Sequence, residues 1–167
     1  MYTPIKQEIV SVLVKNQPNV LNRVTSLYGR RGFNIDSLTV SPTNDPGLSR
    51  ITIAFTASET KMQQIITQTE KLEVVESITL MDRSNSLYRE LLLLKVNASA
   101  EQRSAIKEIV EIYRAKIVDL TRASMIIELT GTPEKLNAFV DMMSEFNVTE
   151  VCRTGVAGIE SHTKKGE

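Results

Sequence analysis

The chain contains 167 residues, of which 41% are hydrophobic and 24% are charged, a balance typical of a soluble globular protein. Twenty basic residues offset twenty acidic ones, so the total charge provides no positive field for general nucleic-acid binding. One cysteine excludes an internal disulfide, and one histidine excludes zinc sites built from several histidines. The N-terminus has no apolar leader and no apolar run reaches about 18 residues, so we expect a cytoplasmic protein without a membrane partner.

The first eighty residues carry the hydrophobic patterns of four strands and two helices. Their order is βαββαβ, with strands at 7–14, 35–42, 50–56 and 74–80 and helices that begin at Val20 and after Ser58. Leu21 widens the apolar stripe of the first helix. Arg30, Arg31 and Gly32 end that helix, because basic residues favour a helix C-terminus and glycine readily adopts the left-handed conformation beyond it.

Two local details of the first half are also predicted. In the turn at 44–47, we expect Pro46 to fix φ and Gly47 to supply a positive φ that closes a hairpin. The strand at 50–56 alternates between apolar and polar residues, which indicates one buried face and one solvent-exposed face.

The same order of elements repeats after a polar segment at 82–86. Strands are predicted at 87–96, 116–120, 125–129 and 148–153, with helices through 106–113 and from Pro133, where Thr132 supplies a cap. We therefore expect an α+β protein of two tandem ferredoxin-like domains, residues 1–82 and 83–167, each an antiparallel sheet with both helices on one face. Small domains with unpaired sheet edges favour association, so a homodimer is expected.

The residue types that enzymes use for covalent or acid–base chemistry are scarce. The sequence has no G-x-x-x-x-G-K-[ST], G-x-G-x-x-G or G-x-S-x-G motif, so no phosphate loop or nucleophile elbow is predicted. Cys152 falls in the last apolar strand, where a free cysteine usually acts as a small hydrophobic residue, and His162 lies in a polar tail. We expect no catalytic residues and no metal site. A tandem of RNA-binding βαββαβ domains is the alternative, although the strand at 50–56 presents no aromatic stacking platform on its polar face.

The segment before the first helix has the chemistry of a small-molecule site. Asn16, Gln17 and Asn19 lead into a helix N-terminus, whose free N–H groups and dipole attract an anion such as a carboxylate. Asn34 follows the same helix, and an amide can both donate and accept. These groups suit a zwitterionic amino acid whose side chain would contact Val20, Ile35 and Leu38. The alternative is that the asparagines form an ordinary turn and Asn19 caps the helix.

Several longer motifs support one family. They are N-x-x-x-x-L-x-R-V (16–24), R-G-F-N-I-D-S-L-T-V (31–40), T-N-D-P-G-L-S-R-I-T-I (43–53), E-L-L-L-L-K-V (90–96), I-Y-R-A-K-I-V-D-L-T (112–121), L-T-G-T-P-E-K-L-N-A-F (129–139) and R-T-G-V-A-G (153–158). Together they closely resemble the regulatory, or small, subunit of acetohydroxyacid synthase, also called acetolactate synthase.

This resemblance implies an N-terminal ACT domain that binds an effector and a C-terminal ACT-like domain. Members of the family are not catalysts and need no cofactor of their own. They activate a catalytic subunit that uses thiamine diphosphate, Mg and FAD in valine, leucine and isoleucine synthesis, and they commonly mediate inhibition by valine. The ACT domains pair as a homodimer, and no nucleic acid is involved.

The resemblance also implies an effector site at the dimer interface, between the loop before the first helix of one chain and the segment after that helix of the other. By motif position, Asn16 and Asn34 are polar ligands and Ile35 lines the pocket. Asn19, Val20 and Leu21 complete the expected site. The family usually has glycine at the position of Asn19, so we expect a weak response to valine or a different ligand.

Overall fold

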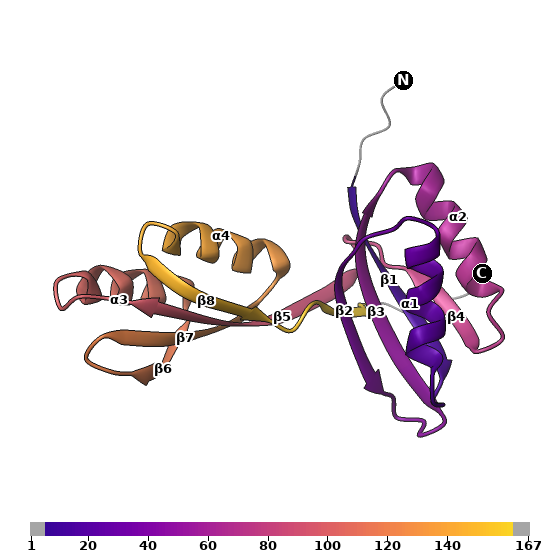
Figure 1. Ribbon diagram of the computed structural model, residues 1–167, viewed down its shortest axis with the longest axis horizontal. Helices are drawn as coiled ribbons and strands as arrows, with labels where there is room; N and C mark the ends of the chain where they lie inside the picture. Colours follow the sequence, from indigo (N-terminus) through magenta and orange to yellow (C-terminus); the bar gives the residue numbers. More distant parts are fainter. Residues whose placement is uncertain (1–5, 162–167) are drawn as a thin grey trace. The chain divides into compact units, whose positions relative to one another are not determined.

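The computed structural model describes residues 6–161 and forms two compact units (Figure 1). Of the described residues, unit 1 contains 6–87 and 155–161, and unit 2 is Tyr88–Thr154. The sequence placed residues 155–161 in a second domain that begins at 83. In the structure residues 155–161 group with the first compact unit, and β9 (Ala157–Glu160) within this segment pairs with β5 (Ser86–Asn97). No helix within residues 6–161 is long and apolar enough to span a membrane.

Unit 1 has the predicted βαββαβ order, followed by one additional strand. Its elements are β1 (Lys6–Lys15), α1 (Val20–Arg30), β2 (Ile35–Pro42), β3 (Leu48–Ala57), α2 (Glu59–Glu70), β4 (Val75–Leu80) and β9 (Ala157–Glu160). The first four strands form an antiparallel sheet in the order β2-β3-β1-β4, and both helices lie on one side of it (Figure 1). This arrangement confirms the ferredoxin-like fold for the first half.

The core of unit 1 lies between the sheet and its two helices. Alternate residues of β1 and β3 face the helices and are almost fully buried, because side chains alternate across a strand. Tyr28, Phe33 and Phe55 pack edge to face, with ring centroids 5.6 to 6.1 Å apart. Burial raises the pKa of Tyr28 to about 12. Within residues 6–161 the Tyr28 hydroxyl makes no hydrogen bond.

The ends of the first helix follow the sequence prediction. Gly32 has φ 74°, and the amide of Phe33 donates to the carbonyl of Tyr28 at 2.9 Å, which closes the helix C-terminus. Ser58 precedes α2 as predicted, although its side chain makes no capping hydrogen bond within the described chain.

The turn at 44–47 differs from the prediction. Gly47 is not among the described residues with positive φ. Its amide donates to Oδ1 of Asp45 at 2.8 Å, and the amide of Leu48 donates to the Asp45 carbonyl at 3.0 Å. An aspartate side chain that bonds the backbone two residues on closes the turn without a left-handed residue.

The polar face of β3 is covered, which corrects the expectation that it is open to solvent. Thr52 and Ala54 on this face are each 3% exposed. The Thr39 hydroxyl of β2 donates to the carbonyl of Val156 at 3.1 Å, and Val156 is itself buried. The segment that contains β9 therefore lies over the face opposite the helices.

Unit 2 repeats the fold with its own core. Its elements are β5 (Ser86–Asn97), α3 (Gln102–Tyr113), β6 (Lys116–Leu120), β7 (Ser124–Gly131), α4 (Pro133–Met143) and β8 (Asn147–Arg153), with strand order β6-β7-β5-β8. Alternate residues of β5 and β7 pack against both helices. The hydroxyl of Thr132 accepts from the amide of Lys135 at 3.3 Å, which confirms the predicted cap.

The last strand of unit 2 carries an ion pair and the cysteine. Glu90 is 6% exposed, and its carboxylate accepts from Arg153 at 2.5 Å, while Arg153 also donates to Asn137 at 2.6 Å. Cys152, in the strand that the sequence predicts to be apolar, is exposed. It lies opposite Leu93 on an edge strand, where one face is open to solvent.

Candidate functional site

The asparagines that the sequence singled out lie at the two ends of α1. Asn16 and Asn19 precede the helix, and Asn34 follows it. The helix has 11 residues, so its ends are about 16 Å apart at the usual rise per residue. One chain therefore does not bring Asn34 to the other two asparagines.

The pairing of the strands shows independently that Asn16 and Asn34 lie far apart in one chain. Lys15, next to Asn16, pairs with Leu48 of β3, whereas Ile35, next to Asn34, pairs with Phe55 seven positions further along that strand. Seven positions on a strand correspond to about 23 Å. The two halves of the predicted site are thus at opposite ends of the same sheet.

Asn16 forms hydrogen bonds with the turn between β2 and β3. Its side-chain Nδ2 donates to the carbonyl of Pro46 at 3.1 Å, and its backbone amide donates to the carbonyl of Gly47 at 2.8 Å. These bonds connect the loop before α1 to the turn between β2 and β3. The Asn16 side chain is exposed, and the Oδ1 atom can still accept a hydrogen bond.

Asn19 has a backbone conformation that glycine adopts more readily than other residues. Its φ is 65° and its ψ is 1°, the left-handed region that asparagine tolerates better than most residues. The alternative that its side chain caps α1 is wrong, since no such hydrogen bond exists in the described chain. The Asn19 amide is exposed at a helix N-terminus whose first turn contains no acidic residue, so an anion would meet no repulsion there.

The apolar residues of the expected site differ in their exposure. Val20 is 4% exposed and belongs to the core of unit 1, whereas Leu21 is 40% exposed at the surface of α1. Ile35 and Leu38 are partly buried against the same core. Leu21 and Ile35 are the residues that can offer apolar surface to a ligand.

Asn34 follows α1, and its side chain is available to a ligand. It is exposed, and no hydrogen bond engages its side chain among residues 6–161. The next polar residue, Asp36, accepts hydrogen bonds from Thr56 at 2.8 Å and from Gln7 at 3.3 Å and is thereby part of the sheet surface. Within residues 6–161, no group of three or more acidic, histidine or cysteine side chains is placed to hold a metal ion. His162 lies outside the described residues.

Comparison with known proteins accounts for both units. Residues 10–77 match the family described as the AHAS small subunit-like ACT domain, and residues 89–162 match the family described as the small subunit of acetolactate synthase. A probable acetolactate synthase small subunit of Archaeoglobus fulgidus is 43% identical over 157 residues, which cover 93% of this chain and 98% of that protein. The chain belongs to the acetolactate synthase small-subunit family.

Other family members agree over the same length. The small subunit of acetolactate synthase isozyme 3 from Salmonella typhimurium is 38% identical over 159 residues, 95% of this chain and 98% of that protein. The crystal structure of the acetolactate synthase small subunit from Thermotoga maritima superposes with a TM-score of 0.84 at 38% identity, covering 95% of this chain and 99% of that chain. The resemblance found in the sequence motifs is therefore confirmed across the chain.

Proposed function

We propose that this chain is a regulatory subunit that activates an acetolactate synthase catalytic subunit and carries feedback by valine or a related branched-chain amino acid. Family membership supports the partnership, because the relatives are small subunits of that enzyme. In this proposal the chain is cytoplasmic and supplies no catalytic residues. Thiamine diphosphate, Mg and FAD would belong to the catalytic subunit.

The separation of the asparagines carries the proposal for the effector site. An amino acid cannot contact groups about 16 Å apart at the two ends of one α1 helix. Two copies in antiparallel arrangement would place Asn34 of one chain beside Asn16 and Asn19 of the other, at both ends of a two-fold interface. The site is then complete only in the homodimer.

The chemistry of the assembled site fits a zwitterion. The free N–H groups at the start of α1 would receive the effector carboxylate, and the exposed amide of Asn19 could add a donor. The carbonyl oxygens of Asn34 and Asn16 would accept from the ammonium group. Leu21 and Ile35 would contact the aliphatic side chain. Contacts from two chains let the effector favour one dimer arrangement, which is the requirement for coupling to activity.

Asn19 is the residue that sets the strength of the response in this proposal. Its backbone keeps the left-handed conformation, so the loop path is preserved while the side chain occupies space near the carboxylate position. We expect valine to inhibit the reconstituted enzyme weakly and the Asn19→Gly variant to be inhibited at about 5- to 150-fold lower valine concentration, the range of typical coupling energies.

The test is a valine titration of acetolactate formation by the catalytic subunit reconstituted with each variant. Asn34→Ala should abolish the response and leave activation unchanged, because its side chain is uncommitted in the described chain. Asn147→Ala, an exposed asparagine in unit 2, serves as the matched control. Loss of activation together with the response would show that Asn34 shapes the contact with the catalytic subunit, and equal strong inhibition of the native and Asn19→Gly chains would contradict the role of Asn19.

A further inference from the structure

A row of hydroxyl side chains crosses the sheet of unit 1 on the face opposite the helices. Thr39 of β2 pairs with Thr52 of β3, Thr52 pairs with Ser11 of β1, and Ser11 pairs with Thr79 of β4. Each strand therefore contributes one hydroxyl at the same level. Cross-strand hydroxyl pairs stabilise a sheet, but a face that is simply covered by its own chain would be expected to be apolar.

The segment from Gly155 to Glu160 lies over this row. The Thr39 hydroxyl donates to the Val156 carbonyl at 3.1 Å. Ser11 is 5% exposed and Thr52 is 3% exposed, so the middle of the row is removed from bulk water. Toward β4 the cover is incomplete and leaves a hollow of about 230 Å³, whose lining includes Ser11, Arg50, Thr79, Met81, Ile159 and Glu160.

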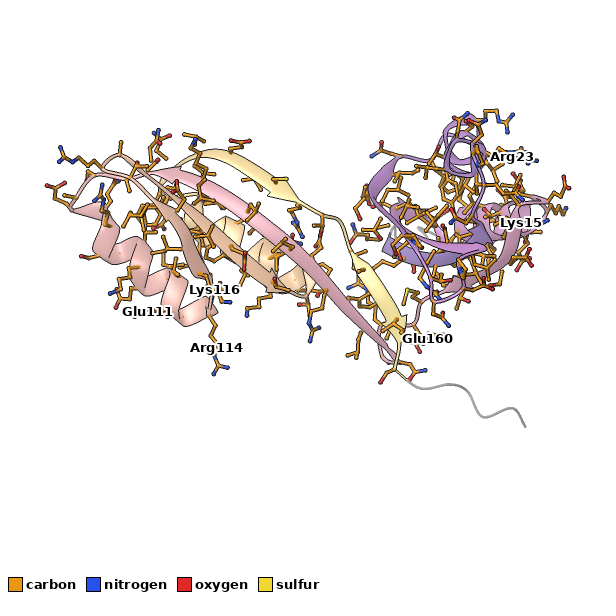
Figure 2. All side chains as sticks on the ribbon, turned by 90° about the horizontal axis from the view of Figure 1, so that it is seen from below. Lys15, Arg23, Glu111, Arg114, Lys116 and Glu160 are labelled. Carbon is orange, nitrogen blue, oxygen red and sulfur yellow. The ribbon has the colours of Figure 1, made fainter. Side chains whose placement is uncertain are left out.

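The hollow contains two opposite charges that do not bond to each other. Arg50 extends from β3 and donates from Nη1 to the Ser11 hydroxyl at 2.6 Å, which fixes the position of the guanidinium group. Glu160 comes from β9, the yellow strand that carries this label in Figure 2. No ion pair joins Arg50 and Glu160 in the described part of the chain, although both line the same small space.

We propose that this hollow binds a small zwitterionic α-amino acid. Its carboxylate would pair with the N–H donors of Arg50 that Ser11 does not use, since guanidinium groups bind carboxylates with two parallel bonds. Its ammonium group would pair with Glu160, and the hydroxyls of Ser11 and Thr79 would bond to its remaining polar atoms. The side chain of Met81, which also lines the hollow, provides apolar surface for a short ligand side chain.

The charge pair and the volume select this class of ligand. A plain anion would be repelled by Glu160 and a plain cation by Arg50, whereas a zwitterion satisfies both. A space of about 230 Å³ lies below the usual range of pockets for drug-sized molecules, so it excludes nucleotides and favours ligands of a few heavy atoms.

This site is distinct from the one proposed for the effector of the holoenzyme. All of its lining residues belong to unit 1 of a single chain, so it needs no second copy. A ligand held by both Arg50 and Glu160 would also fasten β9 to the sheet. The occupied site would thereby stabilise the covering segment against local opening.

The test is a titration of the full-length chain with glycine, L-alanine, L-serine and L-threonine, followed by the NMR shifts of backbone amides. At least one of these amino acids should shift the amides of Ser11, Arg50 and Gly158 in a saturable way. Arg50→Gln and Glu160→Gln should each weaken that binding by about 10- to 100-fold, the effect of losing a hydrogen bond to a charged group.

Matched controls remove the same charges elsewhere. Arg114→Gln and Glu145→Gln change exposed residues of unit 2 and should bind as tightly as the native chain. Asn34→Ala should also leave these shifts intact, which separates this site from the effector site. The proposal is overturned if none of the four amino acids shifts these amides, or if folded Arg50→Gln, checked by circular dichroism, binds with native affinity.

Discussion

Replacement of Gly155 by alanine is expected to destabilise unit 1 by about 2 kcal/mol. Gly155 has φ +84°, a conformation that costs an L-residue about 1 kcal/mol or slightly more. A Cβ atom at this position would also lie 3.1 Å from Cβ of Ser37 and 3.4 Å from the backbone nitrogen of Leu38. Both neighbours are on β2, so the covering segment must move away from the sheet, and we assign about 1 kcal/mol to this contact.

Two other glycines separate the two contributions. Gly32 also has positive φ, 74°, but an added Cβ would meet nothing within 4 Å among the described residues, so Gly32→Ala should lose about 1 kcal/mol. Gly29 lies within α1 without positive φ and is equally open. Gly29→Ala should therefore stabilise the unit by about 0.5 to 1 kcal/mol, the difference in helix propensity.

Native-state hydrogen exchange of the buried β3 amides measures these changes within unit 1, because a protein of two units need not unfold in one step. The Gly155→Ala variant should raise the opening constant of those amides about 30-fold, which corresponds to about 2 kcal/mol. If Gly155→Ala behaves like Gly29→Ala, then the segment is not held against β2 as described. If it matches Gly32→Ala, the contact with Ser37 contributes nothing.

Two further predictions concern buried polar groups. Arg153→Met should destabilise unit 2 by about 2 to 3 kcal/mol in urea denaturation, because the carboxylate of Glu90, 6% exposed, loses its charged partner. Addition of Glu90→Gln should recover part of the loss, and a change under about 0.5 kcal/mol for Arg153→Met alone would argue against the pair. Burial raises the pKa of Tyr28 from 10.0 to about 12, so the unfolded tyrosine loses its proton first and the free energy of unfolding should fall by about 1.4 kcal/mol per pH unit between these values. Tyr28→Phe should remove this pH dependence of the free energy of unfolding. At pH 7 it should change stability by less than about 1 kcal/mol, since the hydroxyl has no hydrogen bond within residues 6–161. If the pH dependence persists in Tyr28→Phe, another group causes it.

The regular elements of the fold were predictable because each has a clear hydrophobic period. The stripe from Val20 to Tyr28 and the alternation along β3 indicate which faces meet the core, and the termination of α1 at Gly32 follows from the glycine itself. Thr132 and Pro133 marked the start of α4, because a capping hydroxyl and a proline are both favoured at the first positions of a helix. These signals are local, so one sequence is sufficient to read them.

The features that were missed depend on contacts between distant parts of the chain. Strand β9 has four residues and no period; it pairs with β5, and the residues just before it contact β2 through Thr39 and Gly155. Because the sequence does not show that cover, Thr52 was expected to face solvent, whereas it is 3% exposed.

The sequence pattern did not show how far apart the residues of the candidate site lie in one chain. Asn19 has the left-handed backbone conformation, which the hydrophobic pattern of the sequence does not indicate. The distance between Asn16 and Asn34 could have been estimated from the length of the intervening helix, and that signal already argues for two chains.

A complementation experiment tests the shared site most directly. Chains carrying Asn16→Ala and chains carrying Asn34→Ala, both in an Asn19→Gly background, are mixed, unfolded and refolded together, and the valine response of the reconstituted synthase is measured. If each site combines Asn16 of one chain with Asn34 of its partner, each mixed dimer has one intact site, and about a quarter of all sites should respond again. If the mixture stays as unresponsive as either variant alone, the two asparagines do not join across a dimer and the proposed effector site is wrong.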